Sequence, residues 1–129
     1  MTGQSLIDGA RKAAENSYSP YSNFRVGAVV VADDGRIFTG ANIENAAYPS
    51  GSCAEATAIN TAASAGVRKI DTVAVACIDA EEVEGAYPCG RCRQIMSEFD
   101  VDRVIVTAGE GSEVREHTLD ELLPHRFDL

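Results

Sequence analysis

Basic residues and large aromatic side chains are scarce in this chain. Among its 129 residues, 11 are Lys or Arg and 20 are Asp or Glu, which gives a net charge of −9, and tryptophan is absent. Only two of the basic residues, Lys12 and Lys69, are lysines. A protein that binds nucleic acid needs a basic face to neutralise phosphates. The composition therefore argues against nucleic acid as a partner, and by the same charge argument against an anionic membrane surface.

Long apolar runs are also missing. No stretch approaches the roughly 18 consecutive apolar residues of a membrane-spanning helix, and residues 1–17 lack the apolar segment of a signal peptide. We therefore expect a cytoplasmic protein without membrane contact. In such a reducing compartment, metal binding or catalysis is expected of the cysteines before disulfide formation. There are four of them: Cys53, Cys77, Cys89 and Cys92.

The length and composition of the chain are those of one globular domain. With 45% hydrophobic and 24% charged residues, the chain is close to the average for such proteins, and its length falls within the usual size of a domain. We therefore expect residues 1–129 to form a single domain.

Apolar periodicity and turn signals predict the order of the secondary structure. In chain order, the sequence predicts a helix at 4–16, strands at 24–32 and 36–41 joined by an Asp-Gly turn at 33–35, a helix at 53–65, a strand at 72–78, a helix at 88–99, a strand within 101–107, a weak strand or turn at 114–118 and a helical turn at 119–123. Strands that alternate with helices after an opening hairpin favour an α/β fold. We expect three α/β/α layers around a mixed five-stranded sheet.

Three of the cysteines stand where a helix is expected to begin. Cys53 precedes one helix, and the segment Pro88-Cys89-Gly90-Arg91-Cys92 opens another. The first turn of a helix has unpaired N–H groups and a partial positive charge, which stabilise thiolates. Because Cys89 and Cys92 are three residues apart, they share one helix face and can chelate one ion. Cys53 supplies a third ligand.

A zinc ion with three protein ligands keeps its fourth position open, as catalytic zinc does. A water bound there ionises near neutral pH and becomes a hydroxide nucleophile. Glu55 is too close to Cys53 to be needed as a ligand, and can instead carry a proton from that water to a leaving group. Two other interpretations stay open: a redox-active Cys-x-x-Cys pair, and a structural zinc site with Cys77 as fourth ligand. Cys77 lies in an apolar strand and is better explained as a buried small hydrophobe.

Taken together, these motifs resemble a known family. Cys53-Ala54-Glu55 followed by Pro88-Cys89-Gly90-Arg91-Cys92 resembles the zinc nucleoside deaminases. Further segments are similar to the small homotetrameric cytidine deaminases, in order along nearly the whole chain: PYSNFRVGA at 20–28, GANIEN at 40–45, and LLP at 122–124 with Phe127.

The resemblance implies an activity and an assembly. It implies hydrolytic deamination of cytidine and deoxycytidine to uridine and deoxyuridine in pyrimidine salvage. One Zn²⁺ per subunit would be held by Cys53, Cys89 and Cys92, with Glu55 as general acid and base. It also implies a homotetramer whose sites lie at subunit interfaces, and a cytidine deaminase-like fold.

The resemblance further implies a set of substrate-binding residues. Asn42 and Glu44 would contact the ribose hydroxyls. Phe24 and the backbone around Ala54 would contact the base. Tyr48 and Phe127 would reach a neighbouring subunit's site. The alternation of Asn42 and Glu44 with Ile43 predicts an extended segment with the two polar side chains on one side and Ile43 toward the core.

The chain departs from the family's pattern at Ala56. Related deaminases often carry an arginine there, which can donate to the thiolates, and three thiolates with Zn²⁺ sum to a charge of −1. We hypothesise that helix N-terminal amides offset most of this charge with help from Arg91 or Arg93. An equally open interpretation makes both arginines surface or subunit-contact residues.

Three rival functions remain on the sequence alone. A blasticidin-type deaminase shares the motif, but Asn42 and Glu44 favour an ordinary ribose. A polynucleotide-editing deaminase is disfavoured by the acidic charge. A structural-zinc interaction module would use all four cysteines. His117, His125 and the acidic stretch 79–84 do not fit a metal site; surface or interface histidines and a solvated loop are expected.

Overall fold

The computed structural model describes residues 2–111 and 113–129. Five strands form one mixed sheet in the order β2-β1-β3-β4-β5. They are β1 (Val26–Ala32), β2 (Ile37–Ala41), β3 (Ile70–Cys77), β4 (Arg103–Thr107) and β5 (Val114–Thr118). β3 and β4 are parallel, and the other neighbouring pairs are antiparallel. The predicted mixed five-stranded sheet is confirmed.

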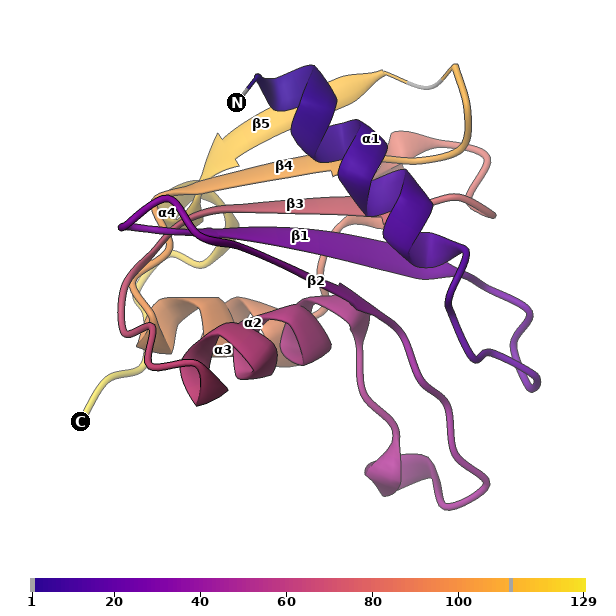
Figure 1. Ribbon diagram of the computed structural model, residues 1–129, viewed down its shortest axis with the longest axis horizontal. Coiled ribbons are helices and arrows are strands. Elements are labelled where there is room, and N and C mark those ends of the chain that lie inside the picture. Colours follow the sequence, from indigo (N-terminus) through magenta and orange to yellow (C-terminus); the bar gives the residue numbers. More distant parts are fainter. Residues whose placement is uncertain (1, 112) are drawn as a thin grey trace.

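Helices cover both faces of this sheet (Figure 1). α1 (Gly3–Ala14) lies on one face, and α2 (Ala54–Ser64) and α3 (Gly90–Glu98) lie on the other. α4 (Leu119–Leu122) is a single turn after β5, and two 3-10 helices at Tyr48–Ser50 and Val83–Ala86 were not expected from the sequence. The three-layer α/β/α prediction is confirmed. Within the described residues, no helix combines the length and apolar character needed to cross a membrane.

Small residues allow the helices to lie close to the sheet. A Cβ added at Gly27 of β1 would lie 2.0 Å from the carbonyl oxygen of Ala10 in α1. One added at Gly40 of β2 would lie 2.5 Å from the backbone nitrogen of Ala58 in α2. α2 buries an alanine-rich face against the sheet, so the Gly40 contact fixes how the helix lies on β2.

The topology brings several chain segments to one end of the sheet, where the termini of neighbouring strands meet. β1 is antiparallel to both β2 and β3, with Gly27 opposite Ala41 and Val26 opposite Cys77. The start of β1 therefore lies beside the ends of β2 and β3. The connections that leave those two ends lead to the N-termini of α2 and α3. The residues singled out in the sequence come from these segments.

Candidate metal centre and active site

The three predicted metal ligands come together. Cys53 is the N-cap of α2, Cys89 is the N-cap of α3, and Cys92 lies in the first turn of α3. Their sulfur atoms all lie within 4.8 Å of one another. Among residues 2–111 and 113–129, this is the one cluster of three Cys, His or carboxylate side chains placed to share a metal ion. We call it the three-thiol group.

The three-thiol group has the electrostatics of a ligand set. Hydrogen bonds from Cys92 and then Cys89, together with the positive charge of Arg91, lower the pKa of Cys53 to about 6. The same bond raises the pKa of Cys92, because its proton is shared with Cys53. Thiolates are the ligands that zinc prefers in three- and four-cysteine sites, so the donor set fits a zinc ion.

Glu55 is a buried carboxyl group beside this group. It lies in the first turn of α2, and only 5% of its surface is exposed. Burial raises the pKa of Glu55 to about 7, and the negative charge of Cys53 adds to this shift, whereas hydrogen bonds from its own backbone and from Cys92 oppose it. A carboxyl group in such surroundings can both hold and release a proton near neutral pH. Its place beside the cluster, rather than in it, is the one expected for a proton carrier.

The fourth cysteine lies outside the three-thiol group. Cys77 ends β3, is buried, and donates to the carbonyl of Ala86 with an Sγ–O distance of 3.7 Å. Burial raises the pKa of the Cys77 thiol to about 12. Cys77 is therefore the buried small residue that the apolar strand predicts, and a structural site built from all four cysteines does not match this structure.

Asn42 joins two chain segments at the site edge. Its side-chain oxygen accepts from the backbone N–H of Val26 at 2.9 Å and from the hydroxyl of Ser17, and its Nδ2 donates to the carbonyl of Phe24 at 2.8 Å. An amide has two acceptor sites and two N–H donors. Both acceptor sites are used, so contact with a ligand must come from the second N–H.

Glu44 is engaged in the same way. Its carboxylate accepts from the backbone N–H groups of Tyr21 at 2.9 Å and Ser22 at 3.1 Å, and from the Ser22 hydroxyl. The Ser22 hydroxyl is the main reason why the pKa of Glu44 is lowered. Asn42 and Glu44 thus both face the segment 17–26, as the predicted alternation requires.

The expectation for Ile43 was wrong. Its side chain is 47% exposed rather than turned to the core. β2 ends at Ala41, so Ile43 lies beyond the edge of the sheet. There its backbone forms single bridges to Tyr18 and Ser52. The segment is extended, but no core lies behind it.

The other expected substrate contacts fall into two groups. Phe24 is half-buried against the core between the sheet and α2 and α3, and Ala54 is fully buried in the first turn of α2. Asn23, at φ 57°, turns the chain into Phe24 in a left-handed conformation that asparagine tolerates. In contrast, Tyr48 is 90% and Phe127 is 67% exposed, so neither is fixed by the packing of its own chain.

The two arginines that follow Cys89, Arg91 and Arg93, have different partners in the structure. Arg91 lowers the pKa of Cys53 through its charge, as the hypothesis requires. Arg93 instead donates Nε to the carbonyl of Pro88 at 2.8 Å and Nη1 to that of Leu122 at 2.6 Å. The suggestion that Arg93 offsets thiolate charge is therefore not supported, because its guanidinium is used on backbone carbonyls.

An ion pair between Arg25 and Asp79, which we call the clamp, was not expected from the sequence. Asp79 follows β3 and accepts from the backbone N–H of Arg25 and from its Nε and Nη2, at 2.8, 2.9 and 2.8 Å. The bonds tie the start of β1 to the end of β3. The two residues are 54 positions apart, and nothing but their opposite charges could have indicated the pairing.

His117 also has a partner that the sequence did not indicate. Its Nε2 lies 2.8 Å from the hydroxyl of Tyr87, which precedes Pro88 in the chain. His117 projects from the outer strand β5 and is half-buried. As expected, neither His117 nor His125 belongs to the three-thiol group.

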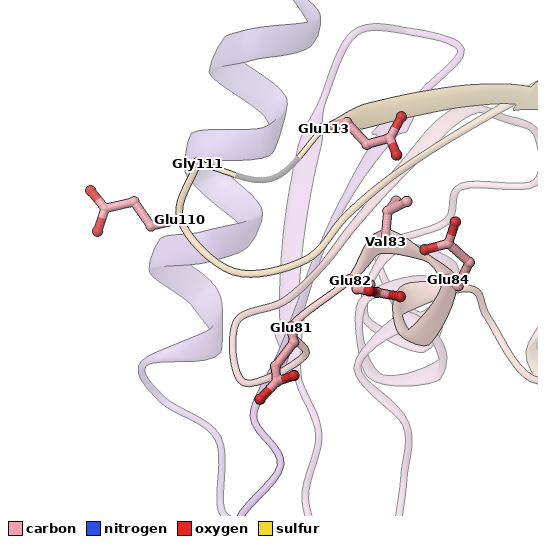
Figure 2. A pocket seen from close by; sticks show the side chains of 7 residues that line it. All are labelled: Glu81, Glu82, Val83, Glu84, Glu110, Gly111 and Glu113. Carbon is pink, nitrogen blue, oxygen red and sulfur yellow. The ribbon is translucent and has the colours of Figure 1, made fainter.

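A separate hollow of about 550 Å³ lies among acidic residues. It is lined by Glu81, Glu82, Val83, Glu84, Glu110, Gly111 and Glu113. Figure 2 shows that Glu81 and Glu110 point away from Glu84 rather than toward a common centre. Arg115 already pairs with Glu84 and Glu113 at 2.8 Å. The expectation of a solvated acidic loop fits this arrangement.

Three thiols and a buried carboxyl group, held at the N-termini of two helices on one face of a mixed sheet, define a metal-site enzyme of the α/β class. Residues 1–108 match the family model described as the cytidine and deoxycytidylate deaminase zinc-binding region. The chain belongs to the cytidine and deoxycytidylate deaminase family, and its three-thiol group fits the zinc in that description.

Individual relatives agree over nearly the whole length of the chain. It is 43% identical over 128 residues to a cytidine deaminase of Halalkalibacterium halodurans, which covers 98% of this chain and 95% of the relative. It is 38% identical over 124 residues to a cytidine deaminase of Mycobacterium tuberculosis, which covers 96% and 88% of the two chains. The crystal structure of cytidine deaminase from Burkholderia pseudomallei matches with a TM-score of 0.90 at 41% identity, over 98% of this chain and 100% of the other.

Proposed function

We propose that the chain hydrolyses cytidine and deoxycytidine to uridine and deoxyuridine with release of ammonia, in pyrimidine salvage. The observation that carries this proposal is the buried Glu55 beside the three-thiol group. Membership of the deaminase family and relatives named cytidine deaminase support the reaction class. Residues 1–129 would act as one catalytic domain.

Cys53, Cys89 and Cys92 would hold one zinc ion per subunit. When bound, zinc supplies Lewis-acid chemistry that makes water acidic near neutral pH. Arg91 and the N-terminal N–H groups of α2 and α3 would offset the charge of the thiolates. The remaining steps belong to side chains of the protein.

Glu55 would move two protons during the reaction. It first takes a proton from the attacking water and gives it to N3 of the pyrimidine, which makes C4 more electrophilic. The water oxygen bonds to C4. Glu55 then takes the second water proton and gives it to the 4-amino group, which leaves as ammonia while the C4 carbonyl forms. One carboxyl group is sufficient for both transfers, because it is buried next to the site of attack.

Asn42 and Glu44 would bind the sugar. The second N–H of Asn42 can donate to a ribose hydroxyl, and the Glu44 carboxylate can accept from one. A carboxylate repels a phosphate, so these two side chains favour a free nucleoside over a nucleotide. Phe24 would pack on the pyrimidine ring, and the backbone around Ala54 would contact its polar edge.

We also infer a homotetramer with sites at the subunit interfaces. Exposed aromatic and apolar side chains lie on the two linked segments 17–23 and 42–52, namely Tyr18, Tyr21, Ile43 and Tyr48. Such surfaces are typical of interaction sites. Tyr48 and Phe127, exposed in the single chain, would reach a neighbour's site.

Three closely spaced free thiols also suit the reducing conditions of the cytoplasm, where we propose that the protein acts.

The experiment is an absorbance assay with four substrates. Zinc-loaded protein is mixed with cytidine, deoxycytidine, deoxycytidylate or blasticidin S, and the loss of the ultraviolet band of the amino-pyrimidine is followed. We expect turnover of cytidine and deoxycytidine, little of deoxycytidylate, and none after zinc is removed. Turnover of blasticidin S alone would move the substrate to the antibiotic nucleosides. Turnover of none of the four by folded, zinc-loaded protein would contradict the proposal.

A further inference from the structure

Arg93 connects two parts of the molecule that are distant in the sequence. It lies in α3 directly after the ligand residue Cys92. Its Nε donates to the carbonyl of Pro88, the residue before Cys89, and its Nη1 donates to the carbonyl of Leu122, the last residue of α4. One side chain thus joins the turn that presents two thiols to the segment that follows α4.

The neighbouring residue strengthens this connection. Nε2 of Gln94 donates to the carbonyl of Phe127 at 3.1 Å. Two consecutive side chains of α3 therefore hold carbonyl groups at positions 122 and 127. We call residues 122–129 the C-terminal segment and residues 88–92 the ligand turn.

The partners of Arg93 are two backbone carbonyls, so its side chain can fix how two stretches of backbone lie relative to each other. Pro88 and Leu122 are buried residues, and a buried carbonyl without a partner is unfavourable. The planar guanidinium donates in two fixed directions at once, so it sets the relative position of the two carbonyls. The carbonyl of Pro88 belongs to the peptide bond that leads into Cys89. Its direction therefore helps to set the direction of the Cys89 side chain.

We propose that Arg93 is a positioning residue that couples the ligand turn to the C-terminal segment. Through Pro88 it sets the geometry of Cys89 and Cys92, and through Leu122 it sets where the C-terminal segment leaves α4. Metal at the three-thiol group then orders the C-terminal segment, which carries Phe127, and loss of the Arg93 bonds loosens both. This inference rests on the metal centre proposed above.

Cobalt can test this coupling because its spectrum reports ligand geometry. The full chain is loaded with Co²⁺, and the visible bands of the thiolate–cobalt centre are recorded during a titration against a chelator. Residues around a metal site that orient its ligands are worth about 10- to 100-fold in affinity. We expect Arg93→Ala to shift the bands and weaken Co²⁺ binding at least about tenfold, and Arg93→Lys to restore part of the loss.

A matched control is available in the C-terminal segment. Arg126 donates to the exposed carboxylate of Asp120 and not to a buried carbonyl. We expect Arg126→Ala to keep the wild-type cobalt spectrum and affinity. Hydrogen exchange of peptides covering residues 122–129 gives the second readout. Metal should slow exchange there in the wild type and in Arg126→Ala, and should fail to do so in Arg93→Ala.

The outcomes separate the coupling from simpler explanations. If Arg93→Ala has a lower melting temperature but a wild-type cobalt spectrum and affinity, Arg93 is only a stabilising residue and the inference is wrong. If Arg93→Ala does not fold, the wild type and Gln94→Ala decide: equal exchange of residues 122–129 with and without metal in the wild type contradicts the coupling, as does an undiminished effect of metal in Gln94→Ala. Failure of the wild type to bind Co²⁺ or Zn²⁺ would instead remove the metal centre itself.

Discussion

The two halves of the candidate site are built differently. The metal half consists of side chains at the N-termini of α2 and α3, which are anchored on the sheet through close contacts such as that of Gly40 with Ala58. The sugar half, so called for the proposed role of Asn42 and Glu44, consists of these two residues, which lie beyond the end of β2 and are held by hydrogen bonds to the segment 17–26. Regular elements position the chemistry, and linked loops position the contacts that would choose the substrate.

This difference has a physical consequence. In the metal half, hydrogen bonds from Cys92 and Cys89 and the charge of Arg91 lower the pKa of Cys53 to about 6. Burial, with the negative charge of Cys53, raises the pKa of Glu55 to about 7. In the sugar half, the polar groups are already largely satisfied by the protein. A change in the metal half should therefore abolish chemistry, whereas one in the sugar half should alter substrate binding and local stability.

The largest effect is expected from removing a ligand. Cys89→Ser should lose nearly all bound zinc and all activity, because two remaining thiols hold the ion too weakly. Cys77→Ala, which changes a buried cysteine outside the three-thiol group, should keep one zinc per chain and most of the activity. Elemental analysis of the purified proteins gives the ratio. Loss of zinc from Cys77→Ala would revive the structural four-cysteine site.

Next in size is the contact that anchors the metal half. Gly40→Ala would place a Cβ 2.5 Å from a backbone nitrogen and 2.8 Å from the carbonyl oxygen of Ala54, so α2 must move. We expect a loss of about 2–3 kcal/mol of unfolding free energy and weaker zinc binding. The control is Gly35→Ala in the hairpin turn, where φ is +90° and the space is open. It should cost only about 1 kcal/mol, with zinc affinity unchanged, as urea unfolding and chelator titration would measure.

The sugar half should respond in binding rather than in chemistry. Asn42→Ala removes three hydrogen bonds, which we expect to lower the free energy of unfolding by about 1–3 kcal/mol. It should also raise KM for cytidine more than it lowers kcat, while zinc content stays at the wild-type level. Steady-state kinetics and elemental analysis test this together. If Asn42→Ala loses its zinc, the two halves are not independent.

The smallest effect concerns the clamp between Arg25 and Asp79. The side-chain and backbone bonds from Arg25 lower the pKa of Asp79 to about 2 from its usual value of 3.8. A lowered carboxyl pKa in the folded state stabilises the protein above the unfolded value, and this contribution is lost as pH falls through the folded value. The stability difference between the wild type and Asp79→Asn should therefore be constant above about pH 5 and shrink toward pH 2. Because the pair is exposed, we expect this stability difference to stay below about 1 kcal/mol. A difference that grows on acidification would contradict this assignment.

Much of the fold could be predicted because local patterns agree with it. The apolar run at 72–78, the Asp-Gly turn at 33–35 and the helix 4–16 all formed within a few residues of their predicted bounds. The weak signal at 114–118 became a complete strand, since its pairing with β4 supplies what the local sequence lacks.

The metal half could also be predicted, because its ligands stand at short spacings beside helix starts. The sugar half could be predicted only in part. Ile43 is exposed because β2 ends at Ala41, before it, and the local sequence does not show where the strand ends. The partners of Asn42 lie 16 to 25 residues away in the chain. The roles of Arg91 and Arg93 differ because of their directions on α3, and two arginines in one motif look alike in a sequence.

Glu55 is the residue on which the proposed reaction depends, and one pair of variants tests it directly. Glu55→Gln and the control Glu98→Gln, an exposed residue at the end of α3, are compared in turnover of cytidine and in zinc content. We predict that Glu55→Gln keeps its zinc and loses about 10²- to 10⁴-fold in kcat, while Glu98→Gln behaves as the wild type. A Glu55→Gln protein that keeps both its zinc and substantial turnover would contradict the role of this carboxyl group.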